Sequence, residues 1–322
     1  MKQPIFLVSI FQERIWGGTK LNQVYQYDIP SYQTGECWAI SAHPNGQSIV
    51  RNGKLKGKTL GEIWTEHPDL FGHFNSDRFP LLTKILDAND DLSVQVHPND
   101  EYAKVNENGE LGKTECWYII DCDEDADMIF GHHAHTKEEF IQLVNEGKWD
   151  DLLQRIKIKP GDFFYVPSGT IHALCKGTLV LETQQSSDTT YRVYDYDRRG
   201  KDRKLRELHL DKAIEVTTVP HTLQNTSPTT TKQPGGTVTT YVTEDYFSVY
   251  KWKVESTIEL TQDKHFILCS VINGNGQVRT EKGNFKIESG DHFILPYGMD
   301  SFTIEGSVQI IASHPNNGGT QQ

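Results

Sequence analysis

The sequence has no hydrophobic run long enough to cross a membrane, and it has few cysteines. No stretch of the 322 residues approaches the roughly 18 consecutive apolar residues that indicate a transmembrane helix. The first residues, MKQPIFLVSI, are too short a run, with too polar a continuation, for a secretory signal. The five cysteines are an odd number without a CxxC pair, which is typical of reduced thiols rather than of a disulfide framework. We therefore expect a cytoplasmic protein without a membrane partner.

Basic residues are also in the minority. The chain has 32 Lys and Arg against 44 Asp and Glu, and its formal net charge is −12. This balance argues against nucleic acid as a partner. A small anionic molecule is not excluded, because a few basic side chains can bind it locally. The hydrophobic fraction of 36% is sufficient for a substantial core.

Helical patterns are scarce and are concentrated in short segments near 59–67 and 136–156. Thr136 and Glu139 have the spacing of a capping box at the start of the second segment, and Gly147 is expected to split it into two helices. Most of the remaining chain consists of short β-rich runs separated by Gly, Asn, Asp and Pro, such as CWYIIDC and TLVLETQQ. This pattern predicts a mostly-β fold, a sandwich or barrel with a small helical insertion.

A change in composition and an internal repeat indicate two β domains. Thr, Pro, Asn and Gly dominate near residues 223–236, which predicts a linker between a domain at 1–222 and a domain at 237–322. The frame G-D-x-x-x-x-P-x-G occurs once in each predicted domain, at 161–169 and at 290–298. Three residues after the last glycine, the first copy has His172 where the second has Ser301. One architecture is therefore used twice, with a nitrogen ligand only in its first use. The alternative is that the frame recurs by chance, because Gly and Pro are common in turns.

The stretch DLSVQVHPND carries polar residues with strand spacing. In a strand, residues two positions apart point to the same side of the sheet. Gln95 and His97 therefore share one face, while Val94 and Val96 share the other and are expected to enter the core. Polar side chains in so apolar a strand need partners.

A similar argument applies to GKTECWYII, where Lys113 and Glu115 share one face of a predicted strand. A carboxylate that enters a β-rich interior is costly unless it is paired or bound to a metal. The polar groups that strand parity can direct inward are Gln95, His97, Glu115 and His172. Two imidazoles, a carboxylate and an amide oxygen form a plausible open site for a divalent transition metal. Each histidine alone is more often a hydrogen-bonded residue than a ligand.

Several motifs resemble those of a known family when they are taken in order. RIWGG, GECWAISAHPNG, QVHPND, GKTECWY, PSGTIHAL and ETQQSSDTTYRVYDYDR look like the successive motifs of type I mannose-6-phosphate isomerases, which are zinc-dependent cupin enzymes. The resemblance covers nearly the whole chain and has the short length of the bacterial branch. It implies two cupin-like jelly-roll β-barrels, of which the first is catalytic and the second lacks a metal.

The resemblance also implies an activity and a set of site residues. The activity is interconversion of mannose 6-phosphate and fructose 6-phosphate by proton transfer between C1 and C2 through an enediol. The zinc ligands, for one Zn²⁺ per chain, fall on His97, Glu115 and His172. Gln95 matches a fourth ligand of longer relatives, Arg192 matches the catalytic arginine, and Lys113 matches a lysine that lines the sugar site. For Lys113, substrate contact and a role as base both stay open.

Parts of the same pattern also fit other functions and contacts. A non-haem metal oxygenase uses a similar ligand set on a cupin, and a sugar-phosphate-binding regulator is a non-catalytic alternative. Arg14 is a candidate for phosphate contact, although we favour a solvated surface charge, and Trp16 is either a sugar contact or a core aromatic. The expected partner is a small sugar phosphate, and we expect a monomer or a weak homodimer.

Overall fold

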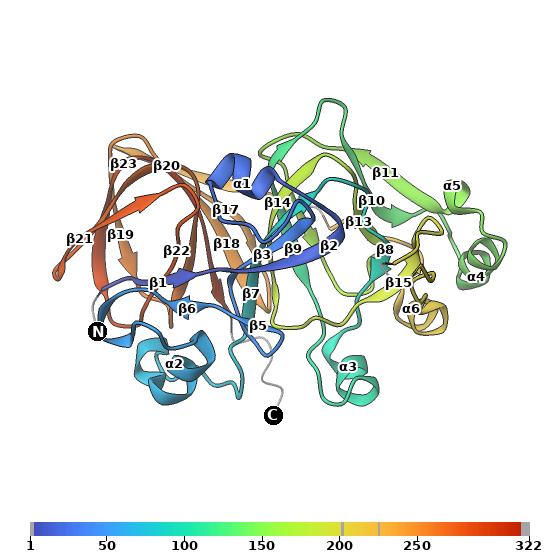
Figure 1. Ribbon diagram of the computed structural model, residues 1–322, viewed down its shortest axis with the longest axis horizontal. Helices are drawn as coiled ribbons and strands as arrows, with labels where there is room; N and C mark the ends of the chain where they lie inside the picture. Colours follow the sequence, from blue (N-terminus) through green and yellow to red (C-terminus); the bar gives the residue numbers. More distant parts are fainter. Residues whose placement is uncertain (1–2, 201–202, 225, 317–322) are drawn as a thin grey trace.

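The computed structural model describes residues 3–200, 203–224 and 226–316, and strands dominate it. Figure 1 shows two β-rich halves side by side, with most helices at the periphery. The predicted mostly-β cupin fold is confirmed. The strands lie in separate open sheets rather than in closed barrels.

The half that carries the predicted site contains two sheets. In spatial order, the strands of the six-stranded sheet are β12 (Phe163–Val166), β9 (Glu115–Cys122), β14 (Thr178–Gln185), β7 (Leu81–Ala88), β3 (Thr34–Ile40) and β2 (Ile10–Gly18). The strands of the five-stranded sheet are β11 (Leu153–Lys157), β10 (Asp127–His132), β13 (His172–Leu174), β8 (Val94–Val96) and β15 (Tyr191–Tyr194). Trp16 and Trp117 of the first sheet share a buried cluster with Met128 and Leu174 of the second. The two sheets therefore pack face to face, as in a sandwich.

The other half is built around a ten-stranded sheet. Its main path runs through β16 (Thr229–Gln233), β17 (Gly236–Thr243), β18 (Phe247–Val254), β23 (Asp300–Pro315), β20 (Ile267–Thr280), β22 (His292–Leu295), β1 (Ile5–Val8) and β6 (Ile49–Val50). β19 (Thr257–Gln262) pairs with β23, β21 (Gly283–Glu288) pairs with β20, and β4 (Ala42–His43) pairs with β5 (Gly46–Gln47) in a separate ribbon.

The sheet pairing bears on the predicted division at 1–222, 223–236 and 237–322. β1 and β6 come from the N-terminal part of the chain, yet they extend the C-terminal sheet beside β22. Residues 229–233, inside the predicted linker, form the edge strand β16, and residue 225 lies outside the described residues. The division itself stays a prediction. Strands from the N-terminal side of the predicted boundary belong to the sheet of the C-terminal half.

Helices are short and lie between strands. They are α1 (Lys20–Tyr25), α2 (Leu60–Glu66), α3 (Asp100–Asn106), α4 (Lys137–Asn145), α5 (Trp149–Leu152) and α6 (Leu210–Val216), with 3₁₀ turns η1 (Gly53–Leu55) and η2 (Pro68–Phe71). Gly147, with a φ of +65°, separates α4 from α5 as expected. The Thr136 hydroxyl accepts from the Glu139 N–H at 3.2 Å. The Glu139 carboxylate, however, accepts from the His135 N–H, so the predicted capping box is only half formed.

The internal repeat is visible as one turn built twice. Gly161 and Gly290 have φ values of +94° and +92°, a region that favours glycine. The next residue, Asp162 or Asp291, donates its N–H to the carbonyl three residues earlier. Its carboxylate accepts an N–H from the same residue at 3.0 Å in the first copy and 2.9 Å in the second. The two copies therefore share their local structure.

Candidate metal centre

Three neighbouring strands of the five-stranded sheet place three of the predicted site residues in one row. Arg192 of β15 lies opposite Gln95 of β8, and Gln95 lies opposite His172 of β13. Directly opposed residues of an antiparallel pair point to the same face of a sheet. The register therefore brings together side chains that are almost 100 positions apart in the sequence.

The alternation predicted for the stretch that contains β8 is present. Val94 and Val96 are fully buried in a cluster with side chains of α4 and α6 on the outer face of the sheet. Gln95 and His97 are on the opposite side, toward the six-stranded sheet. His97 is 1% exposed, and Gln95 is only partly buried.

Glu115 completes the cluster from the other sheet, where it is the first residue of β9. Its Oε2 lies 3.5 Å from Nε2 of His97, and its Oε1 lies 3.2 Å from Nε2 of His172. All three ligand atoms lie within 4.8 Å of one another. Tetrahedral zinc with bonds of about 2 Å has ligand atoms about 3.3 Å apart, so both measured separations are close to this value. In the described ranges this is the one such group of His, Cys, Asp and Glu side chains.

Both imidazoles are held in the tautomer that a metal ligand needs. Nδ1 of His97 lies 2.9 Å from the Thr189 carbonyl, and Nδ1 of His172 lies 2.9 Å from the Thr170 carbonyl. Because a carbonyl only accepts, each Nδ1 carries a proton and each Nε2 keeps its lone pair toward the cluster. Burial lowers the pKa of His172 to about 4 and that of His97 well below its ordinary value. Both rings are therefore neutral near pH 7.

The Glu115 carboxylate is suited to a cation. The side chain is completely buried, and its Oε1 has no hydrogen-bond partner. The ammonium of Lys113 forms an ion pair at 2.7 Å from Oε2 and also lies 3.1 Å from Nε2 of His97. Buried carboxylate oxygens of this kind are costly unless a cation compensates them. The cluster therefore fits a metal ion by its donor types, its spacing and its charge.

Gln95 and Arg192, which are opposite each other in the sheet, are both only partly buried. The Gln95 amide lies 3.4 Å from Nε2 of His172, within reach of the same centre. Arg192 donates through Nη1 to the Glu207 carbonyl at 2.8 Å. Its buried Nε has no hydrogen-bond partner.

Two buried charges beside the cluster were not singled out from the sequence. Glu182 of β14 is 3% exposed and Lys84 of β7 is 4% exposed. The Glu182 carboxylate accepts from Nε1 of Trp117 at 3.0 Å, and Lys84 lies 3.6 Å from its other oxygen. Burial and the neighbouring Glu115 raise the pKa of Glu182. Charged residues inside the otherwise apolar strands LLTKILDA and TLVLETQQ are the signal that marks them.

Arg14 and Trp16 both contact other residues of the protein, Arg14 in an ion pair and Trp16 in the core. Arg14 pairs with Glu36 through two hydrogen bonds, at 2.8 Å and 3.0 Å. The side chain is 32% exposed, so its guanidinium is a partly solvated, paired charge that is not freely directed at a ligand. Trp16 is buried between the two sheets.

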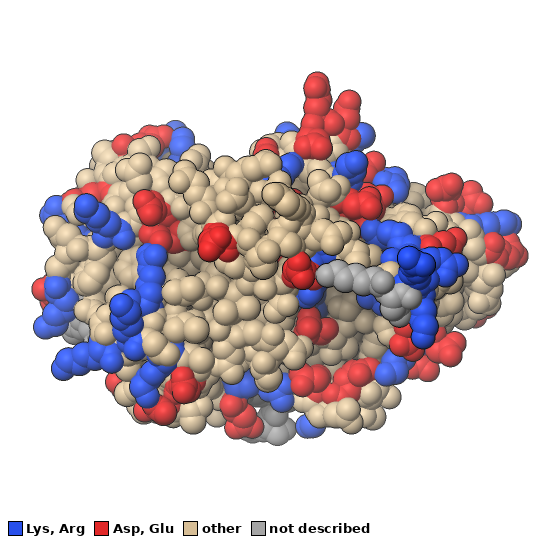
Figure 2. All heavy atoms as spheres, in the orientation of Figure 1, with Lys and Arg blue, Asp and Glu red and all other residues tan. Residues whose placement is uncertain are grey.

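Basic side chains also gather next to Arg192. Arg198 and Arg206 both bond to the carboxylate of Asp195, which follows β15 directly. Figure 2 shows Lys and Arg side chains grouped over this part of the molecule, where β15 and α6 lie in Figure 1. An otherwise acidic protein thus carries local positive charge beside its candidate site.

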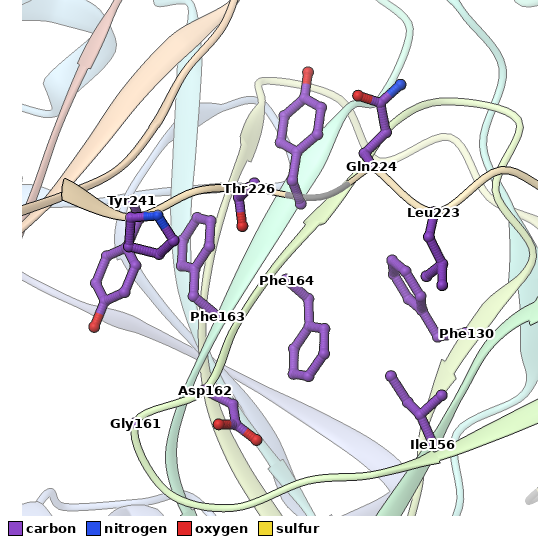
Figure 3. A pocket seen from close by; sticks show the side chains of 12 residues that line it. Phe130, Ile156, Gly161, Asp162, Phe163, Phe164, Leu223, Gln224, Thr226 and Tyr241 are labelled. Carbon is purple, nitrogen blue, oxygen red and sulfur yellow. The ribbon is translucent and has the colours of Figure 1, made fainter.

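A separate groove of about 540 Å³ lies at the edge of β12. Several aromatic residues contribute to its walls, among them Phe163 and Tyr241, as Figure 3 shows. These two rings stack with 4.6 Å between their centroids. None of the six predicted site residues lines it. It is therefore not part of the candidate metal centre.

The fold and the site together define a cupin protein with a candidate metal centre. A family model described as "Phosphomannose isomerase type I, catalytic domain" matches residues 5–120. A second, "Mannose-6-phosphate isomerase, cupin domain", matches residues 237–315. None of the helices in the described ranges is long and apolar enough to span a membrane.

Whole-chain relatives agree with these matches. The mannose-6-phosphate isomerase ManA of Bacillus subtilis is 56% identical over 97% of this chain and 99% of its own length. The mannose-6-phosphate isomerase of Streptococcus mutans is 50% identical over 98% and 99%. A crystal structure of the Bacillus subtilis mannose 6-phosphate isomerase has a TM-score of 0.95 at 57% identity and covers 97% of this chain and 99% of that one. The chain belongs to the type I mannose-6-phosphate isomerase family.

Proposed function

We propose that this protein interconverts mannose 6-phosphate and fructose 6-phosphate, with one zinc ion held by His97, Glu115 and His172. The observation that carries the proposal is the convergence of these three buried side chains from two sheets within 4.8 Å. Two neutral imidazoles and one carboxylate are a typical ligand set of catalytic zinc, which keeps a position open for substrate. Gln95 is proposed as a fourth ligand or as a contact that borders that position.

The reaction moves a proton between C1 and C2 of the open-chain sugar and develops negative charge on the attached oxygens. When bound, zinc supplies a Lewis acid that polarises these oxygens and orients them. The hydrogen bonds that the two Nδ1–H groups donate to the Thr189 and Thr170 carbonyls fix the imidazole rings, so the ligand geometry exists before substrate arrives. Such preorganisation is the usual source of electrostatic stabilisation in enzymes.

Lys113 and Arg192 are proposed to act on the substrate directly. Burial lowers the pKa of Lys113, but the carboxylates of Glu115 and Glu182 outweigh this effect and raise the pKa overall. These carboxylates favour the ammonium form of Lys113, whereas a bound dication would lower its pKa. We assign Lys113 a direct substrate contact, as a hydrogen-bond donor or as the base. Arg192 stays charged at any working pH, and its buried Nε has no hydrogen-bond partner. We assign it the stabilisation of negative charge on the enediolate.

The proposed partner is a small sugar phosphate. All five cysteines are free thiols, which supports the expectation of a reducing, cytoplasmic compartment. Monomer or weak homodimer stays the expected assembly. Family membership favours the isomerase over the oxygenase alternative, and an activity assay separates it from the regulator alternative.

The purified protein is expected to convert mannose 6-phosphate to fructose 6-phosphate in a coupled assay. A chelator should remove the activity, and one equivalent of Zn²⁺ per chain should restore it, because no side chain replaces a Lewis acid at C1 and C2. A metal-replete protein without turnover but with retained sugar-phosphate binding would favour the regulator. Activity that survives complete metal removal would contradict the proposed centre.

A further inference from the structure

The segment 111–114, immediately before Glu115, carries Lys113 but belongs to no strand. Gln185, the last residue of β14, takes the place of a strand neighbour. Its side-chain carbonyl accepts from the Thr114 N–H at 2.8 Å, and its backbone N–H donates to the Thr114 carbonyl at 3.1 Å. Gln185 is 4% exposed, so these bonds are shielded from water.

Asp100, at the start of α3, holds the same segment from the other side. Its Oδ1 accepts from the Gly112 N–H at 2.7 Å and from the Gln185 side-chain amide at 3.0 Å. A Cβ on Gly112 would lie 2.5 Å from the backbone of Asn99 and Asp100. The segment is therefore pressed against the helix start, and a closed set of hydrogen bonds fixes it.

The C-terminal half reaches this network through Tyr246. A cavity of about 700 Å³ between the halves is lined by Tyr246 together with Asp100, Gln185 and Leu111. The Tyr246 side chain faces the same cavity as Asp100, and burial together with the nearby Asp100 carboxylate raises the pKa of the tyrosine. The Tyr246 carbonyl in turn accepts from the backbone N–H of Asn316 at 2.9 Å, just after β23. A residue of the C-terminal half thus lies beside the helix residue that holds the Lys113 segment.

We propose that Asp100 and Gln185 are positioning residues that set the place of the Lys113 ammonium, and that Tyr246 ties their geometry to the C-terminal half. The proposal rests on the proposed function, because it assigns Lys113 to the reaction. The Lys113 backbone N–H bonds to the Pro98 carbonyl at 3.0 Å, and its ammonium lies 3.1 Å from Nε2 of His97. A shift of the 111–114 backbone therefore moves the ammonium relative to the metal ligands. This gives the C-terminal half a role in catalysis without a ligand of its own.

Asp100→Ala is the primary test, and Glu101→Ala is its matched control. Both substitutions remove an acidic residue from the first turn of α3, but only Asp100 accepts from the Lys113 segment. We expect Asp100→Ala and Gln185→Leu to lower kcat roughly 10- to 100-fold with little change in KM, as for a misplaced catalytic group. Metal content should stay at one ion per chain. Asp100→Asn, which keeps the accepting oxygen, should stay within about threefold of wild type.

Hydrogen–deuterium exchange of the metal-free proteins gives a readout that does not require activity. The Gly112 and Thr114 amides should exchange faster in Asp100→Ala than in Glu101→Ala, while the rest of the protein exchanges alike. Equal exchange at 112–114 in the two variants, or equal kcat, overturns the positioning role. If the wild-type protein had no isomerase activity, the proposed function would be refuted. The exchange comparison would still test whether Asp100 fixes the segment 112–114.

Tyr246→Phe tests the link to the C-terminal half, with Tyr250→Phe as control. Tyr250 loses a hydroxyl that bonds to His314 within the same half. Tyr246→Phe should lower kcat and raise exchange at 112–114, each by less than Asp100→Ala, because only a hydroxyl beside Asp100 is lost. Identical behaviour of the two phenylalanine variants would show that the C-terminal half does not act through this contact.

Discussion

His172→Ala is expected to abolish metal binding and isomerase activity together. The imidazole supplies one of three strong ligands, and its Nε2 lies 3.2 Å from the Glu115 carboxylate. A Lewis acid contributes several kcal/mol to such a reaction. A loss of about 4 kcal/mol corresponds to a roughly 1,000-fold lower kcat/KM. Metal quantification by mass spectrometry and the coupled assay, run on the same sample, measure both effects.

His132→Ala is the control for this substitution. His132 is a buried histidine at the end of β10, the neighbour of β13, and it bonds to the Thr218 carbonyl outside the cluster. Its loss should lower stability without lowering the metal content per folded chain. Retention of one metal ion and near wild-type activity in His172→Ala would refute the assignment of His172 as a ligand.

Arg192→Ala is expected to keep the metal and the fold while kcat falls. Removal of one donor that stabilises developing negative charge typically costs about 10²- to 10³-fold in kcat. The side chain makes no contact with Glu115 or His97 among the hydrogen bonds of the described chain, and it bonds to the Glu207 carbonyl instead. Metal content, circular dichroism and steady-state kinetics together distinguish a catalytic loss from a structural one.

Two further substitutions sharpen the Arg192 experiment. Arg192→Lys keeps the charge but loses the planar fork of donors, so it should recover only part of the activity. Arg155→Ala removes an arginine from β11, the opposite edge strand of the same sheet, where it pairs with Asp127. This control should be close to wild type in kcat. If Arg192→Ala released the zinc, the role assigned to Arg192 would be wrong.

The sequence alone was sufficient to place much of the candidate site, because the alternation of side chains between the two faces of a strand is a local property. The alternation from Val94 to His97 predicted which side chains face inward, and the structure has the same alternation. The repeated turn at 161–169 and 290–298 was likewise readable, since Gly and Asp at fixed spacing define it locally. The prediction that His97, Glu115 and His172 together bind one metal ion, however, needed the resemblance to a family as well as the alternation of side chains along the strands.

Features that depend on distant pairing were not predictable in the same way. Nothing local to β1 indicates that it joins the C-terminal sheet beside β22, since the partner and register of a strand depend on the whole fold. The two-bond pairing of Arg14 with Glu36 also depends on how β2 and β3 are aligned. The Asp100–Gln185 network joins α3 to the end of β14, and no spacing in the sequence relates these two positions.

The central claim is that three side chains from two sheets hold one zinc ion. An anomalous difference map of the crystallised protein, recorded at the zinc absorption edge, tests it most directly. We predict one peak per chain, about 2.0–2.2 Å from Nε2 of both histidines and from an oxygen of Glu115. A zinc-loaded, active crystal with no peak between His97, Glu115 and His172, or with its peak elsewhere, would contradict the account.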